Sequence, residues 1–99
     1  MIVTDLSNGQ IDEMSDIVRE GVTSFKLFMA YPNVLMVDDQ TIFKVMQKAA
    51  KIGALVMMHA ENGYAIDELV KQAIAAGNTA PIYHALTRPP AAEGEATNR

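Results

Sequence analysis

Residues 24–31 read SFKLFMAY, and this stretch decides how the chain folds. Its short apolar run predicts a buried β-strand that is apolar on both faces, with Lys26 in its middle. Burying a charged amine is costly unless the charge is removed or paired, so Lys26 requires an explanation. The simplest one is that its aliphatic stem is buried while the ammonium group reaches solvent. A chemical role for Lys26 requires a partner elsewhere in the sequence.

Predicted helices and strands alternate along the chain. The two strands are short apolar runs, and the helices are stretches with helical periodicity or composition. Ser7 or Asn8 is a suitable N-cap for the first helix, and the Asp38-Asp39 pair suits the start of the second. The predicted strands span about 23–29 and 54–59, and the predicted helices span about 9–20, 39–52, 63–76 and 89–98.

The spacing of the strands indicates a repeated strand–helix unit. Gly21 and Gly53 each end a helix just before a strand, and Lys26 and His59 are separated by nearly the same interval. Apolar strands joined by helices predict neighbouring parallel strands, in a sheet that helices cover on both faces. Two strands alone would leave unpaired edges, so we expect a piece of a larger α/β domain. A complete small flavodoxin-like domain is the alternative.

Composition excludes several classes of function. The net charge is −4 and basic residues are not clustered, which argues against binding to nucleic acid or to an anionic membrane. No apolar run is long enough to cross a membrane, and the first residues do not resemble a signal peptide. The chain has no cysteine, which fits a reducing cytoplasm and excludes thiolate chemistry.

Three residues are expected to meet at one end of the sheet. Functional groups in parallel α/β folds gather at the carboxyl ends of the strands, where His59 ends its strand and Tyr31 follows Lys26. An apolar environment favours the neutral lysine amine, which can add carbon dioxide to give an anionic carbamate. A carbamate and a neutral imidazole are both good ligands for divalent metals. The sequence therefore predicts a metal site that includes Lys26 and His59.

The motifs around these residues resemble a known family. The segments GVTSFKLFMAY (residues 21–31) and HAENG (59–63) are similar to those of the hydantoinase and dihydropyrimidinase family of cyclic amidohydrolases. Arg88-Pro89-Pro90, followed by Glu93, Glu95, Ala96 and Arg99, resembles the next stretch of that family in the same order. The resemblance covers nearly the whole chain. It implies a partial (β/α)8 TIM barrel in which residues 1–99 form one segment, about units two to four, incomplete at both ends.

The resemblance also implies roles for individual residues. Lys26, as a carbamate derived from carbon dioxide, would bridge two divalent metal ions, expected to be zinc, and His59 would bind one of them. Tyr31 would donate a hydrogen bond to the oxyanion that forms at the ring carbonyl. Glu61 and Asn62 would orient the ligands, with a simple helix-start turn as the alternative reading.

Part of the family's pattern has no counterpart here. The chain contains no His-x-His pair, and His84 is expected to be structural because it is predicted to lie in a loop. No aspartate is a candidate for the family's proton shuttle. Catalytic metals usually need about three protein ligands each, so we expect these 99 residues alone to be inactive.

The implied activity is hydrolysis of the cyclic amide bond of hydantoins or 5,6-dihydropyrimidines by a metal-activated hydroxide. The products would be N-carbamoyl amino acids, and the enzyme would be a cytoplasmic homo-oligomer, a dimer or a tetramer. One alternative is an allantoinase or dihydroorotase type of amidohydrolase, against which Tyr31 argues. Others are a non-catalytic dihydropyrimidinase-like scaffold protein and a stand-alone α/β binding module.

Overall fold

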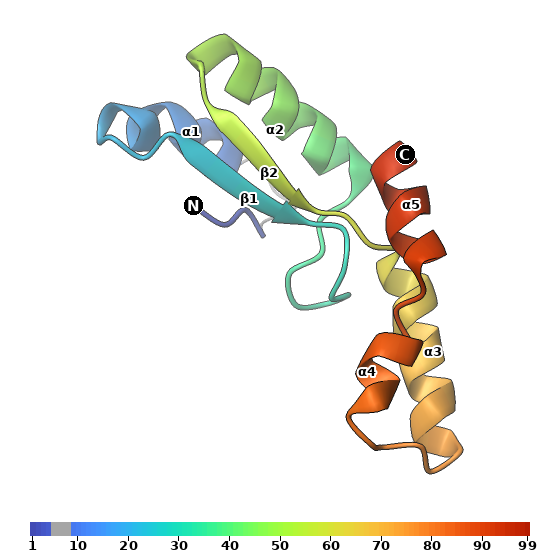
Figure 1. Cartoon of the computed structure of the whole chain (residues 1–99). Helices are drawn as coiled ribbons and strands as arrows, with labels where there is room; N and C mark the ends of the chain where they lie inside the picture. The colour runs from blue at the N-terminus through green and yellow to red at the C-terminus, as the bar shows by residue number, and fades with distance from the viewer. Residues whose placement is uncertain (5–8) are drawn as a thin grey trace.

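The computed structural model describes residues 1–4 and 9–99, so the predicted cap at Ser7 or Asn8 lies outside the described residues. Helices and strands alternate through the first part of the chain, and three helices follow (Figure 1). Most predicted bounds are confirmed to within one or two residues. The elements are α1 (Gly9–Arg19), β1 (Ser24–Phe28), α2 (Asp39–Ile52), β2 (Leu55–His59), α3 (Gly63–Ala75), α4 (Ile82–Leu86) and α5 (Pro90–Asn98).

The two strands are parallel neighbours, as predicted. Their register runs from Ser24 opposite Leu55 to Phe28 opposite His59. The first residues of the chain pair with the other edge of β1, where the Val3 amide donates to the Lys26 carbonyl at 2.9 Å. The first residues of the chain, β1 and β2 therefore stand side by side in chain order.

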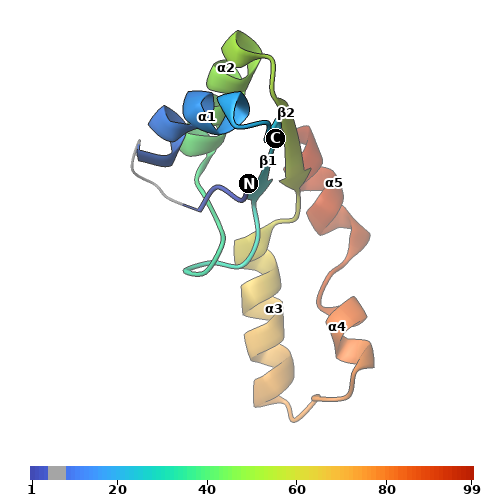
Figure 2. The ribbon, with the colours of Figure 1, turned by 90° about the vertical axis from the view of Figure 1, so that its left-hand side faces the viewer.

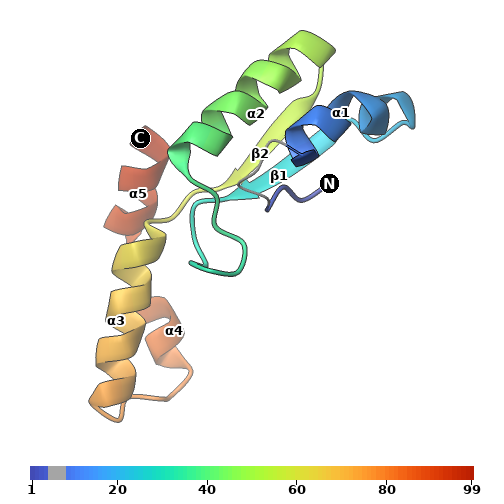
Figure 3. The same ribbon diagram turned by 180° about the vertical axis from the view of Figure 1, so that it is seen from behind.

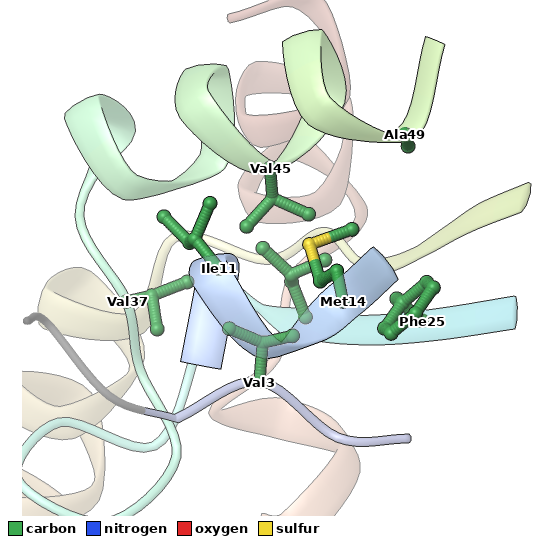
Figure 4. Packing of buried hydrophobic residues seen from close by; sticks show 8 residues of the cluster. Val3, Ile11, Met14, Phe25, Val37, Val45 and Ala49 are labelled. Atoms are coloured by element: carbon green, nitrogen blue, oxygen red, sulfur yellow. The ribbon is translucent and has the colours of Figure 1, made fainter. Parts of the chain in front are cut away.

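Helices α1 and α2 lie on the same side of this sheet (Figures 2 and 3). The core between them and the sheet is the cluster in Figure 4, to which β1 contributes Phe25 and Leu27, both fully buried. The opposite face of β1 and β2 is only partly covered, and Leu55 and Met57 are exposed there. The prediction of strands covered on both faces was therefore wrong for the part of the chain described, because successive crossovers place their helices on one side.

Glycines and one aspartate set the helix ends. Gly21, Gly53 and Gly77 all have positive φ, and Gly53 adopts the left-handed conformation (φ 71°) that ends α2. At the start of α2, the Asp38 side chain accepts a hydrogen bond from the Thr41 amide at 2.7 Å. The hydrogen bond of the Thr41 side chain, followed by that of its amide, lowers the pKa of the Asp38 carboxyl, since both favour the charged form. Asp38 is therefore a helix cap, as predicted.

The short helix α4 was not predicted. Helices α3 and α4 form a hairpin that projects away from the sheet (Figure 1), and α4 carries His84, so the prediction that His84 lies in a loop was wrong. Five residues are too few for a helical period to be recognised, and α4 is held by local bonds such as that from Thr87 Oγ1 to the Tyr83 carbonyl (2.6 Å). None of the helices in the described ranges has the length and apolar character of a membrane span.

Candidate metal and catalytic site

The register of the sheet places Lys26 and His59 on the same face. Side chains alternate along a strand, and paired residues of parallel strands point to the same side. Lys26 therefore shares a face with Phe28, and His59 lies directly opposite Phe28. Standard strand geometry puts the Lys26 and His59 Cα atoms about 8 Å apart, within reach of two long side chains. The site occupies the sheet face that α1 and α2 leave uncovered.

Phe28 is the centre of this group. Its ring stacks on the His59 ring at a centroid distance of 5.3 Å, and the Tyr31 ring lies 5.9 Å away, edge-on. Lys26 Nζ lies 5.4 Å from the same ring centroid, in a cation–π contact. All three residues predicted for the site thus surround Phe28, which the sequence reasoning missed. Its position two residues after Lys26, on the same strand face, was the signal that could have identified it.

Lys26 is half-buried rather than enclosed in the core. Its stem lies on the open face of the sheet beside Phe28, which agrees with the simplest explanation given above. No carboxylate of the described residues lies within ion-pair distance of its amine. The amine is therefore not committed to an internal counter-ion there.

Tyr31 has an unusual backbone. Its φ is 61°, a left-handed conformation that is a genuine outlier for a bulky side chain. The Tyr31 carbonyl accepts three backbone hydrogen bonds, from the amides of the residues at 34, 35 and 36, at 3.0–3.1 Å. In this strained turn the centroid of the Tyr31 ring lies 5.4 Å from the centroid of the His59 ring. Such strain is found where a side chain must be held in a functional position.

The turn after β2 fixes the opposite side of the site. The Asn62 side chain accepts from the Ala65 amide at 3.0 Å and so caps α3, and it also donates to Glu95 of α5 at 3.0 Å. Gly63 approaches the end of β1 so closely that a Cβ atom there would lie 2.8 Å from the Met29 carbonyl oxygen. Asn62 therefore has the helix-start role that was the alternative to ligand orientation.

Glu61 has a different role from Asn62. One of its carboxylate oxygens forms a hydrogen bond with Nε2 of His59. Both side chains are largely buried, with 30% and 18% of the His59 and Glu61 side chains exposed. This contact places a carboxylate on one nitrogen of the predicted ligand, as is typical of metal-binding histidines.

The described residues do not form a metal site by themselves. No three of their histidine, aspartate and glutamate side chains gather closely enough to hold a metal ion. Lys26 and His59 share a face and suit a divalent metal by their chemistry, but His84 lies away from them on α4. A complete site at this face would need ligands in addition to those that the described residues bring together.

Comparisons with known proteins agree with these motifs, although no model of a protein family matches the chain. The D-hydantoinase of Streptomyces coelicolor is 54% identical over 99 residues, which is 100% of this chain and 21% of that protein. The dihydropyrimidinase of Arabidopsis thaliana is 45% identical over 100 residues, covering 100% of this chain and 19% of that protein.

A solved structure gives the same result. The crystal structure of dihydropyrimidinase from Brevibacillus agri NCHU1002 matches with a TM-score of 0.93 and 57% identity, over 99% of this chain and 22% of that one. The chain therefore spans about a fifth of the length of the curated relatives it matches.

Proposed function

The chain belongs to the hydantoinase and dihydropyrimidinase family. We propose that it takes part in the hydrolysis of a cyclic amide. The substrates would be hydantoins or 5,6-dihydropyrimidines, in line with the names of its relatives. The observation that carries the proposal is the placement of Lys26, Tyr31 and His59 around one phenylalanine ring at the carboxyl ends of two parallel strands.

The arrangement of helices supports a (β/α)8 barrel as the parent fold. In a doubly wound sheet, helices cover both faces, whereas a barrel keeps all of its helices outside. Here α1 and α2 lie on one side, and the strand segments follow one another in chain order. The face that carries Lys26 and His59 would then be the interior of the barrel, and residues 1–99 would correspond to about units two to four.

Lys26 and His59 are the residues that would hold metal. Lys26 would do so as a carbamate, which needs an amine free of a competing carboxylate, and this is the state of Lys26 among the described residues. Two divalent metals bound there, which we propose to be zinc, would supply activated water and polarise the ring carbonyl. Further ligands would have to come from outside the described residues.

Tyr31 would act on the substrate. Its phenol hydroxyl can donate a hydrogen bond to the carbonyl oxygen as negative charge develops there. The strained turn at Tyr31 and its contact with the His59 ring support this role, since both hold the phenol beside the predicted ligand. We also propose that the enzyme is a homo-oligomer and is located in the cytoplasm.

The test is a substrate panel on the longest polypeptide that contains this sequence. We expect opening of hydantoin or dihydrouracil to the N-carbamoyl amino acid, bound metal, and a mass increase of one carbon dioxide at Lys26. Lys26→Ala should abolish turnover and metal binding, whereas Lys51→Ala, at an exposed position of α2, should change neither. Turnover of dihydroorotate or allantoin alone would assign a sister activity, and absence of both metal and turnover would identify a scaffold protein.

A further inference from the structure

We propose that Glu61 is a positioning residue that fixes the tautomer of His59, so that the neutral ring carries its proton on Nε2 and its lone pair on Nδ1. A neutral imidazole binds metal through the nitrogen that has no proton, and which nitrogen that is depends on the hydrogen bond made by the other. Metal binding through Nδ1 rests on the proposed function. The tautomer itself is a property of this chain.

The hydrogen bond between His59 and Glu61 determines the assignment. An ionised carboxylate can only accept hydrogen bonds, so the ring nitrogen that it contacts must be the donor. That nitrogen is Nε2, which lies against Oε1 of Glu61. In a neutral ring the proton therefore stays on Nε2, and Nδ1 keeps the lone pair.

The ring is also held in place by its neighbours. Phe28 stacks on it with an interplanar angle of 23°, and the Tyr31 ring lies 5.4 Å away at 48°. Turning the ring to exchange its two nitrogens would break the Glu61 bond inside a largely buried contact. In the described part of the chain the His59 ring makes no other hydrogen bond, since the bond from the Met29 amide goes to the His59 backbone carbonyl; Glu61 therefore selects the nitrogen that carries the proton.

A purely structural role for Glu61 makes a different prediction. Glu61 directly precedes Asn62, the N-cap of α3, and an acidic side chain near a helix N-terminus is favourable. If that were its whole function, replacing Glu61 would change stability and leave the His59 tautomer unchanged. The tautomer is therefore the observable that separates the two roles.

The experiment is nitrogen NMR of the chain with ¹⁵N-labelled histidine, without metal, at a pH where both histidines are neutral. Long-range ¹H–¹⁵N correlations identify the protonated nitrogen of each ring, and His59→Gln assigns the His59 signals. His84 is exposed on α4 and serves as the internal reference for an unconstrained ring. We expect His59 to show the Nε2–H form almost alone.

Two replacements of Glu61 complete the test. Glu61→Met keeps the length of the side chain and Glu61→Ala removes it, and both should give His59 the mixed tautomers of His84. Glu93→Ala, at an exposed site on α5, should leave the Nε2–H form unchanged. Mixed tautomers in the original chain, or an unchanged Nε2–H form in a folded Glu61 variant, would overturn the proposal. The measurement needs neither metal nor substrate, so an error in the proposed function would leave its outcome unaffected.

Discussion

The close contact at Gly63 makes a prediction that can be worked out in some detail. In Gly63→Ala the new Cβ would lie 2.8 Å from both Ala30 Cα and the Met29 carbonyl oxygen, and 2.6 Å from Met36 Cε. The methionine tip can move, but the two backbone atoms cannot without shifting the end of β1. The start of α3 must therefore move away from the turn that carries Tyr31.

The free-energy cost follows from three effects. Overpacking costs about 1–3 kcal/mol, and weakening the 3.2 Å bond from the Gly63 amide to Met29 costs about 0.5–1.5 kcal/mol more. The better helix propensity of alanine offsets at most about 1 kcal/mol of this loss in stability. We expect a net loss of about 1–3 kcal/mol in the free energy of unfolding.

The assay is urea unfolding followed by far-UV circular dichroism. With a slope of about 1 kcal/mol per molar urea for a chain of this size, the midpoint should fall by about 1 M or more. Gly94→Ala is the matched control, because Gly94 lies in α5 with no atom near its added Cβ. It should raise stability by about 0.5–1 kcal/mol. A Gly63→Ala chain as stable as the original would refute the reasoning.

Three further predictions use the same assay. Leu27→Ala removes a fully buried side chain and should cost about 2–5 kcal/mol, whereas Leu55→Ala, which is 62% exposed, should cost far less. Asp38→Ala should lower the free energy of unfolding by about 1 kcal/mol at neutral pH, because the helix cap is lost. Since the folded-state pKa of Asp38 is lowered, this loss of stability should persist above pH 3.8 and vanish well below it. A loss that stays constant with pH would contradict the capping role. Arg99→Ala breaks only surface ion pairs and should change stability by less than about 1 kcal/mol, an effect that salt should screen.

Local patterns in the sequence were sufficient to predict most of the fold. Glycines that end helices, such as Gly21 and Gly53, require a left-handed or similar backbone that other residues avoid, so they mark helix ends without knowledge of tertiary structure. The interval between Lys26 and His59 is nearly that between Gly21 and Gly53, and this similarity predicted that the two side chains lie near each other at one end of the sheet. They lie on one face because the parallel register sets Lys26 opposite Met57, which is two positions before His59 on the same side of the strand.

Features that depend on contacts between distant segments could not be predicted. The bond from Asn62 to Glu95 joins residues 33 positions apart, and nothing in the local sequence of either residue indicates it. The left-handed backbone of Tyr31 is contrary to the preference of an aromatic residue, so propensity would predict the opposite. The contact of Glu61 with Nε2 of His59 depends on side-chain rotamers, which are set only when the turn after β2 has formed.

The order of the strands has a consequence for how the segment folds. The bridge from Ile2 to Lys26 crosses α1, and the pairing of β1 with β2 crosses α2, so each of these two joins segments that are separated by a single helix. A pairing across one helix closes a shorter loop than a pairing between strands farther apart in the chain, so it loses less loop entropy. Closure of the single unit β1–α2–β2 is therefore enough to bring Lys26 and His59 onto one face, without any strand beyond it.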